Sequence, residues 1–337
     1  MSDSLTRVLN ILSETNDFPD IGKPLISNGH YASILDIGDP CLAFSTDGVG
    51  TKLLIAQELD VFKTVGIDVI AMNANDIVCV GAKPIALVDC LSLEIEDTEL
   101  LIEIATGLAE GAKQASISIP GGETAIIPEM LRGPIKGKAF DLVGSCVGLV
   151  KKNKILSGKD LKPGNALVGF ASSGIHSNGF TLARQVFTNA GWPLNKMVAE
   201  LGQTLGEELL QPTKMYVDLG MELLEECQPQ ALFHITGGGF GNLSRLGTNI
   251  GYDIDTLPPP LPIFELISQL GHVSPEEMYR TFNMGVGFCA VVPEDQVAKS
   301  KKIGEQLGIP AYVLGRTTTS KEKLIQIKTS EINITIS

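Results

Sequence analysis

Two stretches of this sequence, residues 44–52 (FSTDGVGTK) and 67–84 (IDVIAMNANDIVCVGAKP), constrain its fold most strongly. In the first, an apolar run leads to Asp47, and glycines follow at positions 48 and 50. We expect a strand that ends on a carboxylate and turns through residues able to adopt positive φ, which leaves backbone N–H groups exposed at one edge. Such an edge suits a metal-bound phosphate.

The second stretch predicts a helix, because Ile67, Ile70, Ala71 and Ala74 recur at helical spacing. Asp76 stands near the far end of this helix and would be a carboxylate held on a rigid element. Pro84 then breaks the helix, because proline disfavours the helical conformation of the residue before it.

Alternating strands and helices are predicted along the whole chain. Leucine and valine at positions 5, 8, 9 and 12 predict a short N-terminal helix, and residues 18–29 read as a loop. Further strands are expected at 41–46, 85–91, 140–150, 166–171, 284–292 and 311–314, and further helices at 99–116, 178–190, 212–227 and 295–307. Residues 119–124 are expected to form a glycine turn that ends in Glu123. This order predicts two α/β domains, residues 1–150 and 151–337, which meet in the charged segment 151–160.

Composition excludes several classes of function. The net charge of −13 argues against a nucleic-acid or anionic-membrane partner, which would require a basic face. No apolar run approaches the ~18 residues of a membrane span, and the polar start MSDSLTR is not expected to be a signal peptide. The six cysteines form no C-x-x-C pair, so we interpret them as buried thiols of a cytoplasmic protein.

Three carboxylates, Asp47, Asp76 and Glu123, each stand beside glycine or at the end of an element. A triphosphate carries about four negative charges, so carboxylates can approach it only through shared Mg²⁺ ions. Taken singly, each also fits a structural role, as a turn cap, a helix cap or a surface loop residue. Asp141 is a fourth candidate, although an aspartate that starts a buried strand can equally be structural.

Several other residues fit a phosphate site. Lys52 follows the glycine turn and could reach phosphate oxygens, or could simply be a solvated lysine. Gly121, Gly122 and Thr124 can offer N–H groups and a hydroxyl to the same phosphates. The Walker pattern is absent, and the G-x-G-x-x-A match at residues 285–290 runs into an apolar strand instead of a helix, which argues against a dinucleotide site.

His176, within SSGIHSNG (172–179), lies in a polar turn where packing gives a histidine little reason to be. Such a histidine could hydrogen-bond a carbonyl oxygen or transfer a proton near pH 7, or could organise the loop through backbone bonds. The pattern G-x-S-x-G is missing around the two preceding serines, so a serine hydrolase is not expected.

Eight motifs in order resemble the aminoimidazole ribonucleotide synthetase family, also called phosphoribosylformylglycinamidine cyclo-ligase. After the two opening stretches they are GGET (121–124), FDLVGSCVG (140–148), SSGIHSNG (172–179), QPTKMY (211–216), HITGGG (234–239) and RTFNMGVG (280–287). They extend over nearly the whole chain. One departure stands before the first strand, where the family usually carries a Gly-Gly-Phe loop and this chain has GHYAS at 29–33.

The resemblance implies a two-domain α/β protein of the α+β type, with an N-terminal sheet that forms a barrel across a homodimer and a mixed C-terminal domain. It implies ATP-dependent closure of formylglycinamidine ribonucleotide to aminoimidazole ribonucleotide in purine biosynthesis, a small-molecule reaction. Metal ligands would be Asp47, Asp76 and Glu123, with Asp76 and His176 as catalytic residues. The residues assigned to ATP are Gly48, Gly50, Thr51, Lys52, Asn75, Gly121, Gly122 and Thr124. The residues assigned to the second substrate are Ser173, Ser177, Asn178, Gly238 and Asn283.

Two alternative classes stay open at this point. One is another ATP-using enzyme of the same fold, namely a selenophosphate synthetase, a thiamine-monophosphate kinase, a hydrogenase-maturation protein or the amidotransferase relative. The other is a non-catalytic nucleotide-binding protein. Selenophosphate synthetases would need a reactive cysteine near the N-terminus, and no cysteine precedes Cys41.

Overall fold

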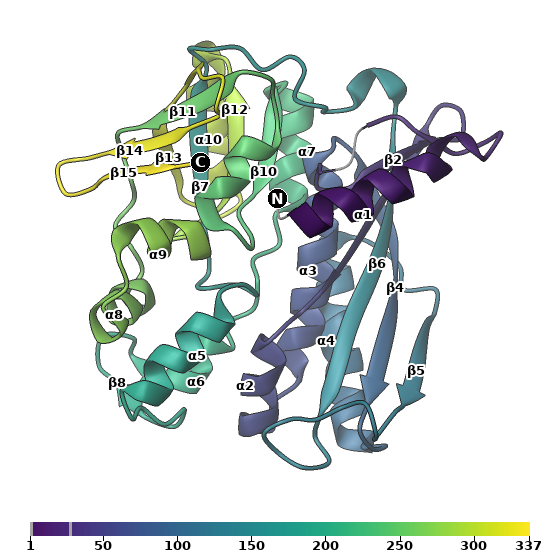
Figure 1. Ribbon diagram of the computed structural model, residues 1–337, viewed down its shortest axis with the longest axis vertical. Coiled ribbons are helices and arrows are strands. Elements are labelled where there is room, and N and C mark those ends of the chain that lie inside the picture. The colour runs from purple at the N-terminus through teal and green to yellow at the C-terminus, as the bar shows by residue number, and fades with distance from the viewer. Residues whose placement is uncertain (1–2, 27–28) are drawn as a thin grey trace.

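The computed structural model describes residues 3–26 and 29–337, which form two α/β halves, each built on its own sheet (Figure 1). Helix α3 (Lys63–Cys79) lies between them and contacts strands of both sheets. It is buried from Val65 to Cys79, which explains why apolar residues occur all around it and not only on one face. The site described below is built at the end of this helix.

The N-terminal sheet has six strands in the order β1-β2-β3-β6-β4-β5. Their bounds are β1 Lys23–Pro24, β2 Ser33–Asp36, β3 Cys41–Gly48, β4 Lys83–Leu93, β5 Gly122–Ile126 and β6 Phe140–Val150. All neighbours are antiparallel except β4 and β5. One face is covered by α3, which packs in turn against α4 (Thr98–Ala115).

Glycines allow α3 and α4 to pack closely. A Cβ atom at Gly107 would lie 1.8 Å from the carbonyl oxygen of Lys63, and one at Gly66 would lie 2.5 Å from that of Ile104. The two helix backbones therefore approach to a distance that no larger residue would permit.

The C-terminal sheet has seven strands in the order β10-β12-β7-β13-β11-β14-β15. Their bounds are β7 Ala166–Ala171, β10 Ala231–His234, β11 Ile250–Ile254, β12 Val286–Val292, β13 Ala311–Thr319, β14 Ile325–Lys328 and β15 Asn333–Ile336. Strands β7, β10 and β12 are almost completely buried, so they read as continuous apolar runs.

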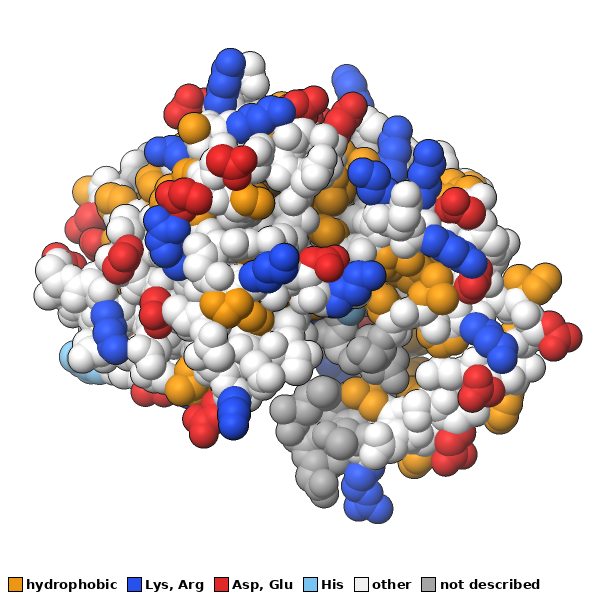
Figure 2. Space-filling view, turned by 90° about the horizontal axis from the view of Figure 1, so that it is seen from above, with side chains coloured by type: hydrophobic (Ala, Val, Ile, Leu, Met, Phe, Trp, Pro, Cys, Tyr) orange, Lys and Arg blue, Asp and Glu red, His pale blue; other side chains and the backbone are white. Residues whose placement is uncertain are grey.

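The other elements connect and cover these sheets. They are α1 (Asp3–Ser13), η1 (Glu14–Asp17), α2 (Lys52–Leu59), η2 (Lys152–Lys154), α5 (Phe180–Asn189), β8 (Met197–Val198), β9 (Gln203–Thr204), α6 (Leu205–Leu209), α7 (Val217–Glu226), η3 (Gly239–Arg245), α8 (Pro262–Gly271), α9 (Pro275–Thr281), η4 (Glu294–Gln296) and α10 (Val297–Gln306). On the face shown in Figure 2, acidic and basic side chains are interspersed. No helix in the described ranges has both the length and the apolar character needed to cross a membrane.

The structure confirms the α/β fold class and most predicted elements, including the N-terminal helix and the strands at 140–150 and 166–171. Three predictions are wrong. Residues Lys23–Pro24, expected within the loop 18–29, form the short strand β1 and pair with β2. Residues Gly122–Ile126, expected as part of a turn, form the edge strand β5. Residues 212–216, expected to be helical, are not, because α7 begins only at Val217. Their backbone groups instead form hydrogen bonds with Asp68 and Asn75 of α3.

All six cysteines are free, and five of them are buried. The exception is Cys90, on the exposed face of β4.

Candidate functional site

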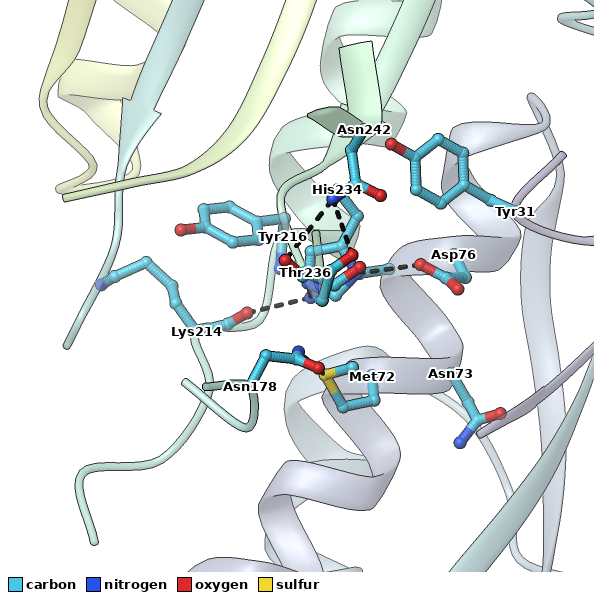
Figure 3. A network of polar contacts seen from close by, with 12 residues as sticks. Tyr31, Met72, Asn73, Asp76, Asn178, Lys214, Tyr216, His234, Thr236 and Asn242 are labelled. Carbon is cyan, nitrogen blue, oxygen red and sulfur yellow. Dashed lines mark hydrogen bonds and ion pairs between the residues drawn. The ribbon is translucent and has the colours of Figure 1, made fainter. Parts of the chain in front are cut away.

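The last turn of α3 meets the end of β10 and joins Asp76 to His234 (Figure 3). The Nδ1 atom of His234 lies 2.9 Å from Oδ1 of Asp76, and the histidine is fully buried while the aspartate side chain is 12% exposed. Asp76 therefore faces a solvent-accessible space with one oxygen already fixed by a hydrogen bond. His234 was missed as a site residue, although it opens the HITGGG motif.

Asn75 fixes the orientation of this histidine. Its Oδ1 accepts from the backbone N–H of Tyr216 at 2.8 Å, and its Nδ2 donates to the carbonyl of Lys214 at 3.0 Å. The same Nδ2 faces Nε2 of His234 at 3.4 Å, so Nε2 accepts and Nδ1 carries the hydrogen that Asp76 receives. Asn75, assigned from sequence to ATP, is fully buried and thus has a structural role instead.

Asp47 is the penultimate residue of β3 and lies beside the same helix. Its Oδ1 accepts from the N–H of Gly48 at 2.8 Å, and its backbone carbonyl accepts from Nδ2 of Asn73 on α3 at 3.1 Å. Burial raises the pKa of the Asp47 carboxyl above its ordinary value, and the negative charge of Asp76 raises this pKa further. Two carboxylates that repel each other in a partly dry setting form a place that a cation would stabilise.

The turn after Asp47 leads into α2. Gly50 has a φ of +72°, which only glycine adopts readily, and Thr51 is exposed, with its Oγ1 3.4 Å from that of Thr181 at the start of α5. The turn residues Gly48, Gly50 and Thr51 are thus next to Asp47 and reach the other half of the molecule.

Glu123 lies far from Asp47 and Asp76 in the N-terminal sheet. The register places Asp47 opposite Gly144, Gly144 opposite Asp89 and Asp89 opposite Gly122, so Glu123 is three strands away from β3. At about 4.8 Å per strand this separation is about 14 Å. The structure therefore does not bring Glu123, Gly121, Gly122 or Thr124 to Asp47 and Asp76 within one chain. Over the described residues, no group of three or more His, Cys, Asp or Glu side chains is arranged to hold a metal.

Lys52 is neither solvated nor available to a surface phosphate. Its Nζ lies 2.8 Å from Oδ2 of Asp68 and donates to the carbonyl of Gln211 at 2.6 Å, and both charged side chains are fully buried. Burial lowers the pKa of Lys52, while Asp68 acts to raise it. The ion pair holds α2 and α3 against the segment 211–213, so its role is to join the two halves.

His176 lies in the loop between β7 and α5 and is buried, with a φ of +67°. Its Nε2 accepts from the backbone N–H of Ser173 at 3.2 Å, so Nδ1 carries the hydrogen, and this buried atom has no protein partner among the described residues. Burial lowers the pKa of His176 well below its usual value, and the positive charge of nearby Lys52 lowers it further. A neutral hydrogen-bond donor thus fits this residue better than a proton carrier near pH 7.

We expect the His176 ring to stay neutral from pH 8 to pH 5, as the Nδ1–H tautomer, because burial opposes a positive charge there. Long-range ¹H–¹⁵N NMR spectra of the labelled protein report tautomer and charge, and a His176→Gln variant assigns the signal. A ring signal that titrates with a midpoint near 6.5 would contradict this description.

The other residues predicted to bind the second substrate divide into two groups. Asn283 is committed to the loop: its Oδ1 accepts from Ser172 Oγ and Gly285 N, each at 2.9 Å, and its Nδ2 donates to the carbonyls of residues 174 and 175. Ser173 and Ser177 bond to residues 212 and 213. These three predicted contacts are therefore replaced by contacts within the protein.

Asn178 and Gly238 lie closer to the open part of the site. Asn178 is half-buried next to Met72 of α3, and a Cβ atom at Gly237 would lie 3.0 Å from its Oδ1 (Figure 3). Gly238 has a φ of +93° and stands immediately before η3. Both residues remain candidates for substrate contacts.

Gly287 on β12 packs against the rings of His176 and Tyr216. A Cβ atom at this position would lie 2.2 Å from the Tyr216 hydroxyl and 2.5 Å from Cε1 of His176. We expect Gly287→Ala to shift both rings, lower the unfolding free energy by about 1–3 kcal/mol through overpacking, and reduce turnover. Thermal unfolding and activity assays measure the two effects. Gly241→Ala is the matched control, because its nearest atom would lie 4.0 Å away. Equal effects of the two substitutions would rule out this explanation.

Comparison with known proteins identifies the family models and the named relatives that the chain matches. Residues 29–150 match the model of the AIR synthase related protein, N-terminal domain, and residues 162–328 match that of the C-terminal domain. The chain is 48% identical to a phosphoribosylformylglycinamidine cyclo-ligase of Methanocaldococcus jannaschii, over 89% of this chain and 85% of that protein. It is 44% identical to the protein of the same name from Thermococcus gammatolerans, over 98% and 95% of the two chains.

Solved structures share the fold at lower identity. A chain of the HypE-HypF complex superposes with a TM-score of 0.67 at 19% identity, covering 97% of this chain and 98% of that one. AaThiL, solved in complex with AMPPCP and TMP, gives a TM-score of 0.67 at 14% identity, covering 98% and 96%. At these identities the likeness concerns the fold alone.

Proposed function

The chain belongs to the AIR synthase related family, and on this basis we propose that it is an ATP-dependent cyclo-ligase that closes formylglycinamidine ribonucleotide to 5-aminoimidazole ribonucleotide in purine biosynthesis. The observation that carries the proposal is the identity of 44–48% to relatives named for this activity, over most of both chains. The alternatives, a hydrogenase-maturation protein or a thiamine-monophosphate kinase, are supported only by a fold shared at 14–19% identity.

The chemistry explains what the site must provide. An amide oxygen is a poor leaving group, so ATP first phosphorylates the formyl oxygen of the substrate. The neighbouring amidine nitrogen then attacks the same carbon, the ring closes, and phosphate leaves with the oxygen. The protein must hold the γ-phosphate of ATP against a formyl group, balance negative charge and exclude water.

We assign Asp47 and Asp76 to a magnesium ion shared with ATP phosphates. Mg²⁺ binds oxygen ligands, often through one or two carboxylates plus substrate phosphates, and it would relieve the repulsion that raises the pKa of Asp47. The ion would neutralise charge on the phosphates. His234 fixes Asp76 through the hydrogen on Nδ1. The N–H groups of the exposed residues Gly50 and Thr51 would face phosphate oxygens, and Nδ1–H of His176 would donate to the formyl oxygen.

ADP release by the purified protein with Mg²⁺ and ATP, with and without formylglycinamidine ribonucleotide, tests this function. Aminoimidazole formation is followed in the same reaction. We expect one ADP for each aminoimidazole formed, and none without the second substrate. Tight ATP binding without substrate-dependent ADP release would instead favour the non-catalytic alternative.

We also propose a homodimer, formed through the face of the N-terminal sheet opposite α3. On this face Phe44 is 41% exposed and Val88 43% exposed, and Val147 stands between their strands, opposite Phe44. A sheet with one apolar, uncovered face requires a partner, and a second copy of residues 1–150 would convert the two sheets into a closed barrel. The dimer would be cytoplasmic, as the six free cysteines favour.

Val88→Arg is expected to produce a monomer, because a buried unpaired charge would oppose the contact between sheets. Sedimentation velocity distinguishes a species of twice the 35.9 kDa chain mass from the single chain. Met197→Arg is the control, since Met197 is 67% exposed on β8, away from this sheet. A wild-type protein that sediments as a monomer at micromolar concentration would contradict the dimer.

A further inference from the structure

The segment before β2 places a tyrosine, Tyr31, against the site. Tyr31 is 6% exposed, and its hydroxyl is buried without a hydrogen-bond partner among the described residues. The backbone there is held firmly: the N–H of Tyr31 donates to Nδ1 of His30 at 2.8 Å, and Nε2 of His30 donates to the carbonyl of Leu156 at 2.8 Å. The backbone at Tyr31 is therefore anchored, through the ring of His30, to the segment around Leu156.

Asn242 on η3 presents the complementary atom. Its Nδ2 donates to the carbonyl of Gly239 at 2.8 Å and also lies 3.2 Å and 3.4 Å from the carbonyls of Gly237 and Thr236. Because three carbonyls surround Nδ2, the oxygen must be the atom that faces away from them. This Oδ1 is buried and also lacks a partner among the described residues.

The two unpartnered atoms share one wall of the site. In a 3₁₀ helix, side chains three residues apart lie on the same face, so Asn242 is aligned with Arg245. The guanidinium of Arg245 lies 4.8 Å from the centre of the Tyr31 ring. Figure 3 shows the hydroxyl end of Tyr31 pointing toward Asn242, near His234 and Asp76.

The Tyr31 hydroxyl, a donor, and the Asn242 Oδ1, an acceptor, together favour one kind of ligand group. A buried hydroxyl or amide oxygen without a hydrogen-bond partner destabilises a protein by about 1–3 kcal/mol. A ligand that supplies partners for both atoms would therefore bind more tightly. A phosphate is a poor partner, because it cannot donate a hydrogen to Oδ1 of Asn242. A group that carries both an N–H and an acceptor atom satisfies both.

We propose that the Tyr31 hydroxyl and the Asn242 Oδ1 recognise the formamide–amidine arm of the second substrate, with the hydroxyl donating to an acceptor atom of that arm and Oδ1 accepting from one of its N–H groups. This assignment rests on the proposed function. It makes Tyr31 a substrate-contacting residue whose hydroxyl a phenylalanine would lack.

Tyr31→Phe tests the assignment, because it removes the hydroxyl and keeps the ring against Arg245. Tyr252→Phe is the matched control: Tyr252 is also buried with an unpartnered hydroxyl, but it lies on β11 in the C-terminal sheet. We expect Tyr31→Phe to raise KM for formylglycinamidine ribonucleotide by about tenfold, the value of one hydrogen bond, with KM for ATP unchanged. The unfolding temperature of the free protein should be equal to or higher than that of the wild type, because the unpaired hydroxyl is gone. The control should leave both KM values unchanged.

Three results would overturn the assignment. An unchanged KM for the second substrate in Tyr31→Phe, with wild-type turnover present, would refute it alone and leave the proposed function intact. A rise confined to KM for ATP would assign the hydroxyl to the nucleotide instead. Absence of aminoimidazole formation by the wild-type protein would refute the proposed function and this inference together.

Discussion

Asp76→Asn is expected to lower kcat by about 10²–10³-fold while the protein remains folded, because it removes the carboxylate charge at the phosphates and weakens the bond to His234. Asparagine has nearly the same size, so packing at the end of α3 should be preserved. Steady-state ADP release measures the loss, and circular dichroism confirms the fold.

Asp253→Asn is the control for this prediction, since Asp253 is an exposed aspartate on β11. Its activity should equal that of the wild type. Isothermal titration with Mg·ATP adds a second readout, because loss of the metal-binding carboxylate should weaken nucleotide binding in Asp76→Asn alone. Activity of this variant within twofold of wild type would remove Asp76 from the mechanism.

Lys52→Met is expected to reduce the free energy of unfolding by about 3–5 kcal/mol, because it leaves the buried carboxylate of Asp68 without its cation. Asp68 also accepts from the N–H of Thr213 at 2.7 Å, so the loss would loosen the contact between the two halves. Urea unfolding monitored by fluorescence and circular dichroism measures the change. Adding Asp68→Asn should restore part of the loss, since no unpaired charge then remains.

Lys63→Met provides the comparison for this pair. Lys63 binds Glu110 at 2.7 Å, but the two side chains are 47% and 42% exposed, so water screens the interaction. Its removal should cost less than about 1 kcal/mol. Similar losses in Lys52→Met and Lys63→Met would show that burial of the first pair has no energetic consequence.

Local patterns were enough to predict about half of the helices and strands, including the longest of each. Apolar spacing located α3 and α4, and continuous apolar runs located β6 and β7. These patterns depend only on residues close together in the sequence. The same reasoning placed Asp47 and Asp76 at the ends of their elements. Glycine-rich turns and the order of eight motifs then identified the family.

Strand order and partner choice were decided only by the tertiary structure. Glu123 follows two glycines, as a loop ligand would, yet pairing of β5 with β4 carries it three strands from Asp47. Lys52 reads as a phosphate ligand, yet its carboxylate partner and a carbonyl from the other half bury it. His234 gains its role only because β10 meets the end of α3. Each of these outcomes depends on contacts between residues far apart in the chain, and periodicity and turn chemistry carry no information about which distant segments will meet.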